Sequence, residues 1–161
     1  MKKLITILLL ALTVISYGQT KIDMLMFNSL NDYRIEHGVE PLVFDSLVWK
    51  ASQHHSVYLS ENGYPDEYVC SSGHLELELV RPWDRVVKYG VKTTRVGECI
   101  VYTIRGLYGT DEDVIGRMLR NWDSSPPHKK MILDDNFTIG AVSIVETDKL
   151  VLGTLNLIIK N

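Results

Sequence analysis

The sequence lacks the features that would give it a covalent scaffold, a membrane span or a nucleic-acid surface. It contains only two cysteines in 161 residues, too few for a disulfide-dense fold, so the fold must rest on a hydrophobic core. After its first 18 residues, no apolar run reaches the roughly 18 residues that mark a membrane-spanning helix. Basic residues are not in excess, because 17 Lys and Arg stand against 20 Asp and Glu without forming a stripe. That balance argues against nucleic acid as a partner.

The N-terminal segment, residues 1–18, has the pattern of a secretion signal peptide. A basic start with two lysines precedes an apolar stretch (4–15), and Ser16 and Gly18 fit the small-residue positions before a cleavage site. Cleavage there makes Gln19 the first mature residue. An uncleaved anchor is the alternative, but about twelve apolar residues are too few to cross roughly 30 Å of hydrocarbon. We therefore expect a secreted protein, periplasmic or extracellular, with no transmembrane segment after cleavage.

The mature chain, residues 19–161, is long enough for one domain with a real core and too short for two. Removing the two lysines of the signal from 17 basic residues leaves 15 against 20 acidic ones, a net charge near −5. In an exported protein Cys70 and Cys99 can pair, closing a loop of about 30 residues that is worth roughly 2–4 kcal/mol. Two free buried thiols are the alternative.

Hydrophobic periodicity divides the mature chain into helices, strands and one extended connection. The expected helices are residues 22–36, 46 to about 61, 83–88, 111 to about 124, and 126 to about 133. The expected strands are 96–104, 137–146 and 149–159, with 39–45 as the extended connection and 75–79 open between strand and loop. The last two strands are apolar on both alternating faces, so both faces of the sheet must be covered. The pattern predicts an α/β fold, a three-layer α/β/α sandwich with a small, mainly antiparallel sheet.

A double proline interrupts the run NWDSSPPHKKMIL, residues 121–133. Pro126 lacks an N–H group and keeps Ser125 out of the helical conformation, so one helix ends near Ser124 and another begins with Ser125 as N-cap. His128 then lies in the first turn, where the helix dipole disfavours the charged imidazole. A neutral imidazole suits a divalent metal; the alternative is a histidine that only hydrogen-bonds the helix terminus.

Several short motifs follow one another in a characteristic order and spacing. They are LNDYR (30–34), HGVEPL (37–42), Ala51 with His55-Ser56, His74, Asp84-Arg85, Gly90, Gly97-Glu98, Trp122, Ser125-Pro126, His128, Ile132-Leu133, Asn136-Phe137 and Ile139-Gly140. This arrangement resembles the CAP superfamily, whose SCP domain occurs in cysteine-rich secretory proteins, antigen 5 and pathogenesis-related proteins, and most closely its bacterial extracellular branch. The resemblance covers nearly all of the mature chain and implies an α/β/α sandwich.

The resemblance also implies a site. A central cleft in this family often carries two histidines and two acidic residues, and some members bind zinc or another divalent ion there. The matching positions are His74, His128 and Glu98 as metal ligands, with Trp122 and Ser125 as cleft residues. Two imidazoles and one carboxylate are an accepted open zinc set. The set of four is incomplete, because Ser125 stands at the second acidic position.

The same resemblance brings the cysteines and two further acids close to the cleft. Cys99 replaces the asparagine that usually follows the Gly-Glu pair. A Cys70–Cys99 disulfide would cross-link two segments at the wall of the cleft. Thiolate ligation of the metal is the alternative. Glu76 and Glu78, close to His74, are either substitute ligands or solvated loop acids, and we favour the loop acids.

Other conspicuous side chains have structural explanations. His54 and His55 lie on the apolar stripe of a helix, where a histidine usually packs and donates one hydrogen bond. His37 precedes a helix-stopping glycine and complements the helix C-terminus. Trp122 is also expected to anchor the core, with an N–H group that needs a partner.

Three functions follow from these features. The favoured one is a secreted binding module whose metal-holding cleft engages a small apolar ligand, a lipid or an exported partner. The alternative is a zinc-dependent hydrolase, a peptidase or esterase, in which Glu76, Glu78 or Asp123 is the general base. The third is an inert scaffold. We favour binding because the incomplete acidic set leaves no dedicated base, and no G-x-S-x-G motif supplies a nucleophile.

Overall fold

The ends of the helices follow capping groups that are visible in the sequence. Thr20 begins the first helix with a capping box, in which its hydroxyl accepts from Asp23 N and the Asp23 carboxylate accepts from Thr20 N. Asp45 caps the second helix by accepting from the N–H groups of the second and third residues after it. Gly38 and Gly63, which follow these two helices, have φ values of +74° and +87°. Such left-handed conformations favour glycine and stop a helix.

A computed structural model describes residues 19–63, 72–76, 80–107 and 109–159. Its helices are α1 (Lys21–Glu36), α2 (Ser46–Asn62), α3 (Pro82–Lys88), α4 (Asp111–Asp123) and α5 (Pro126–Ile132), with two 3-10 turns, η1 (Ser72–His74) and η3 (Arg105–Leu107). Its strands are β1 (Val43–Phe44), β2 (Val96–Ile104), β3 (Ile139–Glu146) and β4 (Leu150–Ile158). The predicted signal peptide lies outside the described residues. No helix within them is long and apolar enough to cross a membrane.

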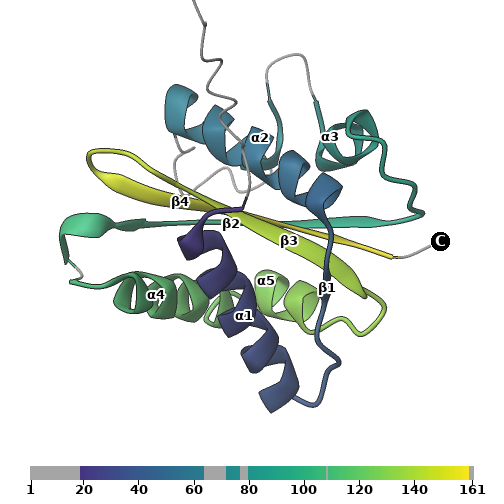
Figure 1. Cartoon of the computed structure of the whole chain (residues 1–161), viewed down its shortest axis with the longest axis horizontal. Coiled ribbons are helices and arrows are strands. Elements are labelled where there is room, and N and C mark those ends of the chain that lie inside the picture. The colour runs from purple at the N-terminus through teal and green to yellow at the C-terminus, as the bar shows by residue number, and fades with distance from the viewer. Residues whose placement is uncertain (1–18, 64–71, 77–79, 108, 160–161) are drawn as a thin grey trace, which may run out of the picture.

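The elements form the predicted three layers. Helices α2 and α3 cover one face of the sheet, and α1, α4 and α5 cover the other (Figure 1). We call these the α2/α3 layer and the α1/α4/α5 layer. The prediction of an α/β sandwich is confirmed, and its physical reason holds, since the inner strands β3 and β4 are buried on both faces.

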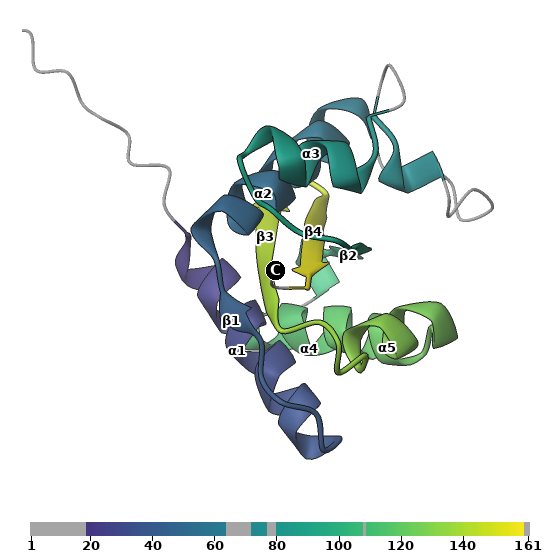
Figure 2. The ribbon, with the colours of Figure 1, turned by 90° about the vertical axis from the view of Figure 1, so that its right-hand side faces the viewer.

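The sheet has the order β1-β3-β4-β2. Strand β4 pairs antiparallel with both β2 and β3, and the short connection between β3 and β4 favours that hairpin. The two-residue β1 joins the other edge of the sheet parallel to β3, with Val43 opposite Ile139. The sequence pattern assigned these residues to an extended connection, because two residues are too few to show a period. Strand β2, at the opposite edge, is contacted by α3 from one layer and by α5 from the other (Figure 2).

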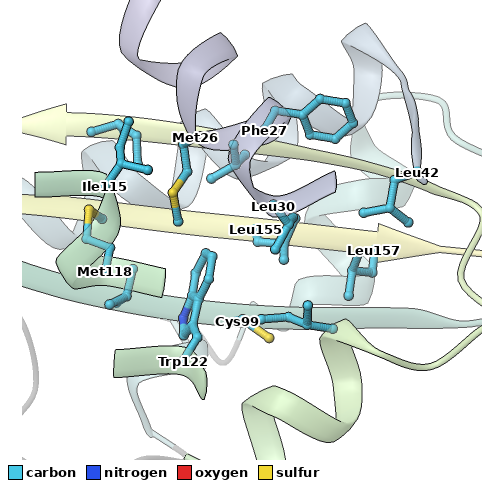
Figure 3. Close-up of a cluster of buried hydrophobic side chains, with 14 of the residues drawn as sticks. Met26, Phe27, Leu30, Leu42, Cys99, Ile115, Met118, Trp122, Leu155 and Leu157 are labelled. Carbon is cyan, nitrogen blue, oxygen red and sulfur yellow. The ribbon is translucent and has the colours of Figure 1, made fainter. Parts of the chain in front are cut away.

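The larger apolar core lies between the sheet and the α1/α4/α5 layer. Met26, Leu30, Met118, Trp122 and Leu155 are among its fully buried side chains (Figure 3). Trp122 Nε1 donates to the Ile100 carbonyl of edge strand β2 at 3.0 Å. The prediction that Trp122 is a core anchor with a partnered N–H is therefore confirmed. The α2/α3 layer is different, because several buried polar and charged groups lie between it and the sheet.

Candidate functional site

Successive side chains of β2 point to opposite faces of the sheet. The candidate site therefore lies on one side of this strand and the larger apolar core on the other. Glu98 points to the α2/α3 layer, where it contacts His74 and Arg85. Gly97 points to the α1/α4/α5 layer, and a Cβ atom there would lie only 2.9 Å from both Met131 Sδ and Phe137 Cζ. The Gly-Glu pair thus lets α5 pack closely on one side of the strand while a buried carboxylate lies on the other.

The carboxylate of Glu98 is held by Arg85 from α3. Arg85 Nη2 donates to both carboxylate oxygens at 2.7 Å, and the two side chains are only 0% and 1% exposed. Burial alone would raise the pKa of Glu98. The hydrogen bond from His74 and the charges of His55 and Arg85 outweigh it, and the pKa of Glu98 lies below its ordinary value. Glu98 is therefore an ionised, fully paired acceptor.

His74 lies at the end of η1 and shares Glu98 with Arg85. Its Nδ1 is 2.9 Å from Glu98 Oε1, and its side chain is 22% exposed. An ionised carboxylate can only accept, so the hydrogen-bond partner assigns the proton to Nδ1. When His74 is neutral, Nε2 then carries the lone pair.

His128 lies in the first turn of α5, as the double proline predicts. Its Nδ1 is 2.9 Å from Ser125 Oγ. Burial lowers the pKa of His128, and the nearby charge of His74 lowers it further. The neutral imidazole expected from the sequence is supported, but the causes are burial and a second histidine. The prediction had invoked the helix terminus instead.

Ser125 occupies the predicted N-cap position of α5, yet its side chain makes no capping bond to the backbone. Its hydroxyl contacts the His128 ring instead. At the position where the family often has a second acid, this chain therefore has a neutral group that holds a histidine. Nothing in this contact supplies a carboxylate.

A second set of polar side chains comes from α2 and from the segment that follows η1. His55 is fully buried, with Nδ1 3.0 Å from Glu76 Oε1 and Nε2 2.7 Å from the Gly73 carbonyl. This arrangement fits the structural role predicted for His55. His54 Nε2 lies 3.3 Å from Glu76 Oε2, and its Nδ1 lies 3.0 Å from the Tyr89 hydroxyl. Burial lowers the pKa of His54, although the charge of Glu76 opposes this.

Glu76 corrects one of the sequence-based interpretations. We favoured a solvated loop acid, but its side chain is 7% exposed and lies 3.5 Å from Arg85 Nη1 as well as beside His55. Burial raises its pKa, whereas the His55 hydrogen bond and the Arg85 charge lower it, and the pKa of Glu76 lies below the ordinary value. Glu78, which we treated in the same way, lies outside the described residues.

The predicted three-ligand metal set can be compared with this geometry. Among the described residues, no group of three or more His, Cys, Asp or Glu side chains is arranged to hold a metal ion. Both oxygens of Glu98 accept from a guanidinium, which lies where a cation bound to that carboxylate would lie. Glu98 does not fit the role of a direct ligand in this arrangement. The imidazoles of His74 and His128 each have Nδ1 beside a protein oxygen, Glu98 Oε1 and Ser125 Oγ. Metal binding itself stays a prediction.

Asp123, a candidate general base, lies apart from these groups. Its carboxylate accepts from the Tyr33 hydroxyl at 2.6 Å and pairs with Lys129 at 2.8 Å. The hydrogen bonds from Lys129 and Tyr33 lower the pKa of Asp123. A carboxylate held in this way is a weak base, and it belongs to the surface between α1 and α4. His37, the C-cap of α1, has its Nδ1 2.8 Å from the Tyr33 carbonyl, in agreement with its predicted role at the helix end.

Cys99 points away from the candidate site. Its thiol is buried and has no disulfide partner among the described residues, and its Sγ lies 3.7 Å from Met131 Sδ in the core between β2 and α5. Burial raises the pKa of Cys99, and the charge of Glu98 raises it further, so the thiol stays protonated. Thiolate ligation of a metal is therefore disfavoured. Cys70 lies outside the described residues, and the Cys70–Cys99 disulfide stays a prediction.

The three-layer fold and the paired His, Glu and Arg side chains define a class of protein, the α/β/α sandwich with histidines beside an edge strand. The model of the cysteine-rich secretory protein family, CAP, matches residues 27–155. The chain belongs to this family. No curated protein matches it in sequence.

Solved bacterial structures share the fold. An outer surface protein from Borrelia burgdorferi superposes with a TM-score of 0.71 at 18% identity, over 89% of this chain and 97% of that one. An extracellular protein containing an SCP domain from Bacillus anthracis gives 0.64 at 24% identity, over 86% of this chain and 40% of that one. The CAP domain of enterococcal PrgA gives 0.56 at 17% identity, over 88% and 62%. Identities this low show the fold alone, and this chain spans less than half of the Bacillus anthracis protein.

Proposed function

We propose that this protein is an exported CAP-domain binding module that holds a divalent cation, such as zinc, between His74 and His128. Beside that cation it engages a small apolar molecule, a lipid or an exported partner. One observation carries the proposal: each histidine has Nδ1 engaged by a neighbouring oxygen, Glu98 Oε1 or Ser125 Oγ, at 2.9 Å. The carboxylate can only accept from His74, which leaves its Nε2 as the ligand atom; the Ser125 hydroxyl can accept from His128 in the same way, and the proposal assigns Nε2 as the ligand atom of that ring too.

Glu98 has a supporting role in this proposal. A carboxylate that accepts the second N–H of a metal-binding histidine fixes its tautomer and raises its basicity. The contact between Glu98 and His74 has this form. The electrostatic coupling of the two histidines supports the same assignment, since the charge of His74 lowers the pKa of His128. A His128 imidazole whose pKa is lowered by burial and by His74 keeps a lone pair that a cation can use.

Hydrolysis is the weaker candidate because the acids of the site that the structure describes are not free to act as a base. Glu76 and Glu98 are both buried, both paired with Arg85, and both have pKa values below the ordinary one. A general base for water works best with a pKa near the operating pH. Neither carboxylate meets that requirement, so the proposal favours binding.

Export is part of the proposal. The N-terminal sequence has a basic start, an apolar stretch and small residues before Gln19. Similar structures come from an outer surface protein and from an extracellular protein. Processing would be tested by N-terminal sequencing of the protein recovered from periplasmic and medium fractions, with Gln19 as the expected first residue.

Zinc titration of the mature protein by calorimetry tests the metal site. We expect one zinc ion per chain for the wild type, and at least about tenfold weaker binding for His74→Ala and for His128→Ala. His37→Ala is the matched control, since His37 is exposed at the end of α1. The proposal fails if the wild type binds no zinc or if the control loses as much affinity as the site variants.

A further inference from the structure

We infer that Arg85 is a positioning residue for His74: it holds both the carboxylate that accepts the Nδ1 proton and the main chain of His74 itself. The inference rests on the proposed function, in which Nε2 of His74 binds the cation. Its central claim concerns the metal-free protein, however, and can be measured there.

The contacts of Arg85 join three separate segments. Nη2 donates to both oxygens of Glu98 on β2 at 2.7 Å, while Nη1 donates to the carbonyl of His74 at 3.1 Å and to that of Val80 at 3.0 Å. Arg85 is 0% exposed. Water therefore cannot replace these donors at their positions, and loss of the side chain would release the carboxylate and the two carbonyls together.

A second buried side chain, His55, also contacts the turn η1. Its Nε2 lies 2.7 Å from the carbonyl of Gly73. The carbonyls of two consecutive residues, Gly73 and His74, thus accept from buried side chains that come from α2 and α3. A turn as short as η1 has few hydrogen bonds of its own. We conclude that the position of His74 is set from outside the turn.

The consequence for His74 is chemical. An unrestrained neutral imidazole exchanges between two tautomers, and the partner of one nitrogen decides which nitrogen keeps the lone pair. While Arg85 holds Glu98 against Nδ1, the proton stays on Nδ1 and Nε2 is free to bind. Without Arg85, neither the carboxylate nor the His74 carbonyl is fixed, and the ring can carry its proton on Nε2, which blocks ligation.

Lysine cannot replace arginine fully at this position. The planar guanidinium reaches Glu98 with one nitrogen and the two carbonyls with the other, whereas an ammonium group is a single point of charge. Arg85 Nε has no hydrogen-bond partner among the described residues, so the positioning acts through Nη1 and Nη2. Arg85→Lys should therefore restore the charge but only part of the geometry.

The test is two-bond ¹H–¹⁵N NMR of the histidine rings in the metal-free mature protein, together with zinc titration. We expect the Nδ1–H tautomer of His74 in the wild type, a mixture of tautomers in Arg85→Met and an intermediate state in Arg85→Lys. Zinc affinity should fall about 10- to 100-fold in Arg85→Met, as for other residues that orient a ligand. Arg34→Met is the matched control, because Arg34 is likewise a buried arginine and donates to the carbonyls of Glu40 and Phe137.

Loss of stability alone would not reproduce this result. Arg34→Met should lower the melting temperature yet leave the His74 tautomer unchanged. The inference is overturned if His74 in the wild type carries its proton on Nε2, or if folded Arg85→Met or Arg85→Lys keeps the wild-type tautomer. If Arg85→Met fails to fold, Arg85→Lys decides, since it keeps the buried charge and changes only the geometry. A tautomer that depends on Arg85 in a protein without zinc affinity would support this inference and refute the proposed function.

Discussion

Substituting Glu98 by Gln removes the negative charge that faces Arg85 and keeps the size of the side chain. Both partners are at most 1% exposed, and the two contacts of 2.7 Å are charge-assisted hydrogen bonds. Removing one member of such a buried pair leaves an uncompensated charge and typically costs about 3–5 kcal/mol. Glu76, 3.5 Å from Arg85, keeps part of the compensation, so we expect the lower half of that range.

The expected loss of unfolding free energy is large compared with the stability of a domain. Native proteins are stable by roughly 5–15 kcal/mol, and each kcal/mol lowers the melting temperature of a domain this size by about 2–4 °C. We expect Glu98→Gln to melt about 6–16 °C below the wild type and to unfold at a lower urea concentration with an unchanged m value.

A double-mutant cycle separates the pair from its surroundings. Arg85→Met, Glu98→Gln and the double variant should show a coupling of about 1–3 kcal/mol, because the double variant no longer buries an unpaired charge at either position. The exposed pair Arg81–Asp84, at 67% and 39% exposure, is the control, and Asp84→Asn should change the melting temperature far less than Glu98→Gln does. A cost below about 1 kcal/mol for Glu98→Gln, or additive single effects, would refute the view that Glu98 is an ionised, buried partner.

The same contacts and the core around them predict three further outcomes. The depressed folded-state pKa values of Glu76 and Glu98 mean that their ionised forms stabilise the fold; that contribution is complete above the ordinary value of 4.5 and is lost as pH falls below it. Urea midpoints should therefore decline below about pH 4.5, and less steeply in Glu98→Gln; equal slopes would contradict the assignment. Trp122→Phe leaves the Ile100 carbonyl without its donor and removes buried volume, so chemical denaturation should show a loss of about 1–3 kcal/mol, whereas a neutral effect would count against the core anchor. Cys99→Ser removes the predicted bridge to Cys70, so the melting temperature should fall in the oxidised protein only; an equal loss in reductant would mean that the thiol acts through packing and not through a disulfide.

Local sequence rules predicted most of the fold because local chemistry decides where its elements begin and end. Thr20, Asp45 and Thr110 cap the three longest helices with their side chains, as residues of these types usually do. Residues 96–104 form a strand with the predicted bounds. The layers followed from the two apolar faces of the last strands, since such strands require cover on both sides.

The candidate site was predicted only in part because its contacts are long-range. The family resemblance indicated His74, His128 and Glu98, but no local rule connects Glu98 to Arg85, 13 residues away, or His55 to Glu76, 21 residues away. One signal was available: a carboxylate in the middle of an apolar strand must be buried, and a buried carboxylate requires a cation. That reasoning predicts a buried partner for Glu98 but does not decide between a metal ion and an arginine, and the contact with Arg85 comes from the structure.

The distribution of charge explains why we propose binding. The buried carboxylates of Glu76 and Glu98 are engaged by Arg85 and by histidines, which leaves them acceptors with depressed pKa values. The partly exposed groups are imidazoles, of which His74 is 22% exposed. A hydrolytic site needs a base that can take a proton from water, whereas a binding site needs only lone pairs held in a fixed direction. Glu98 contacts His74 and Ser125 contacts His128, and these two partly exposed imidazoles are the groups that we propose to meet a ligand.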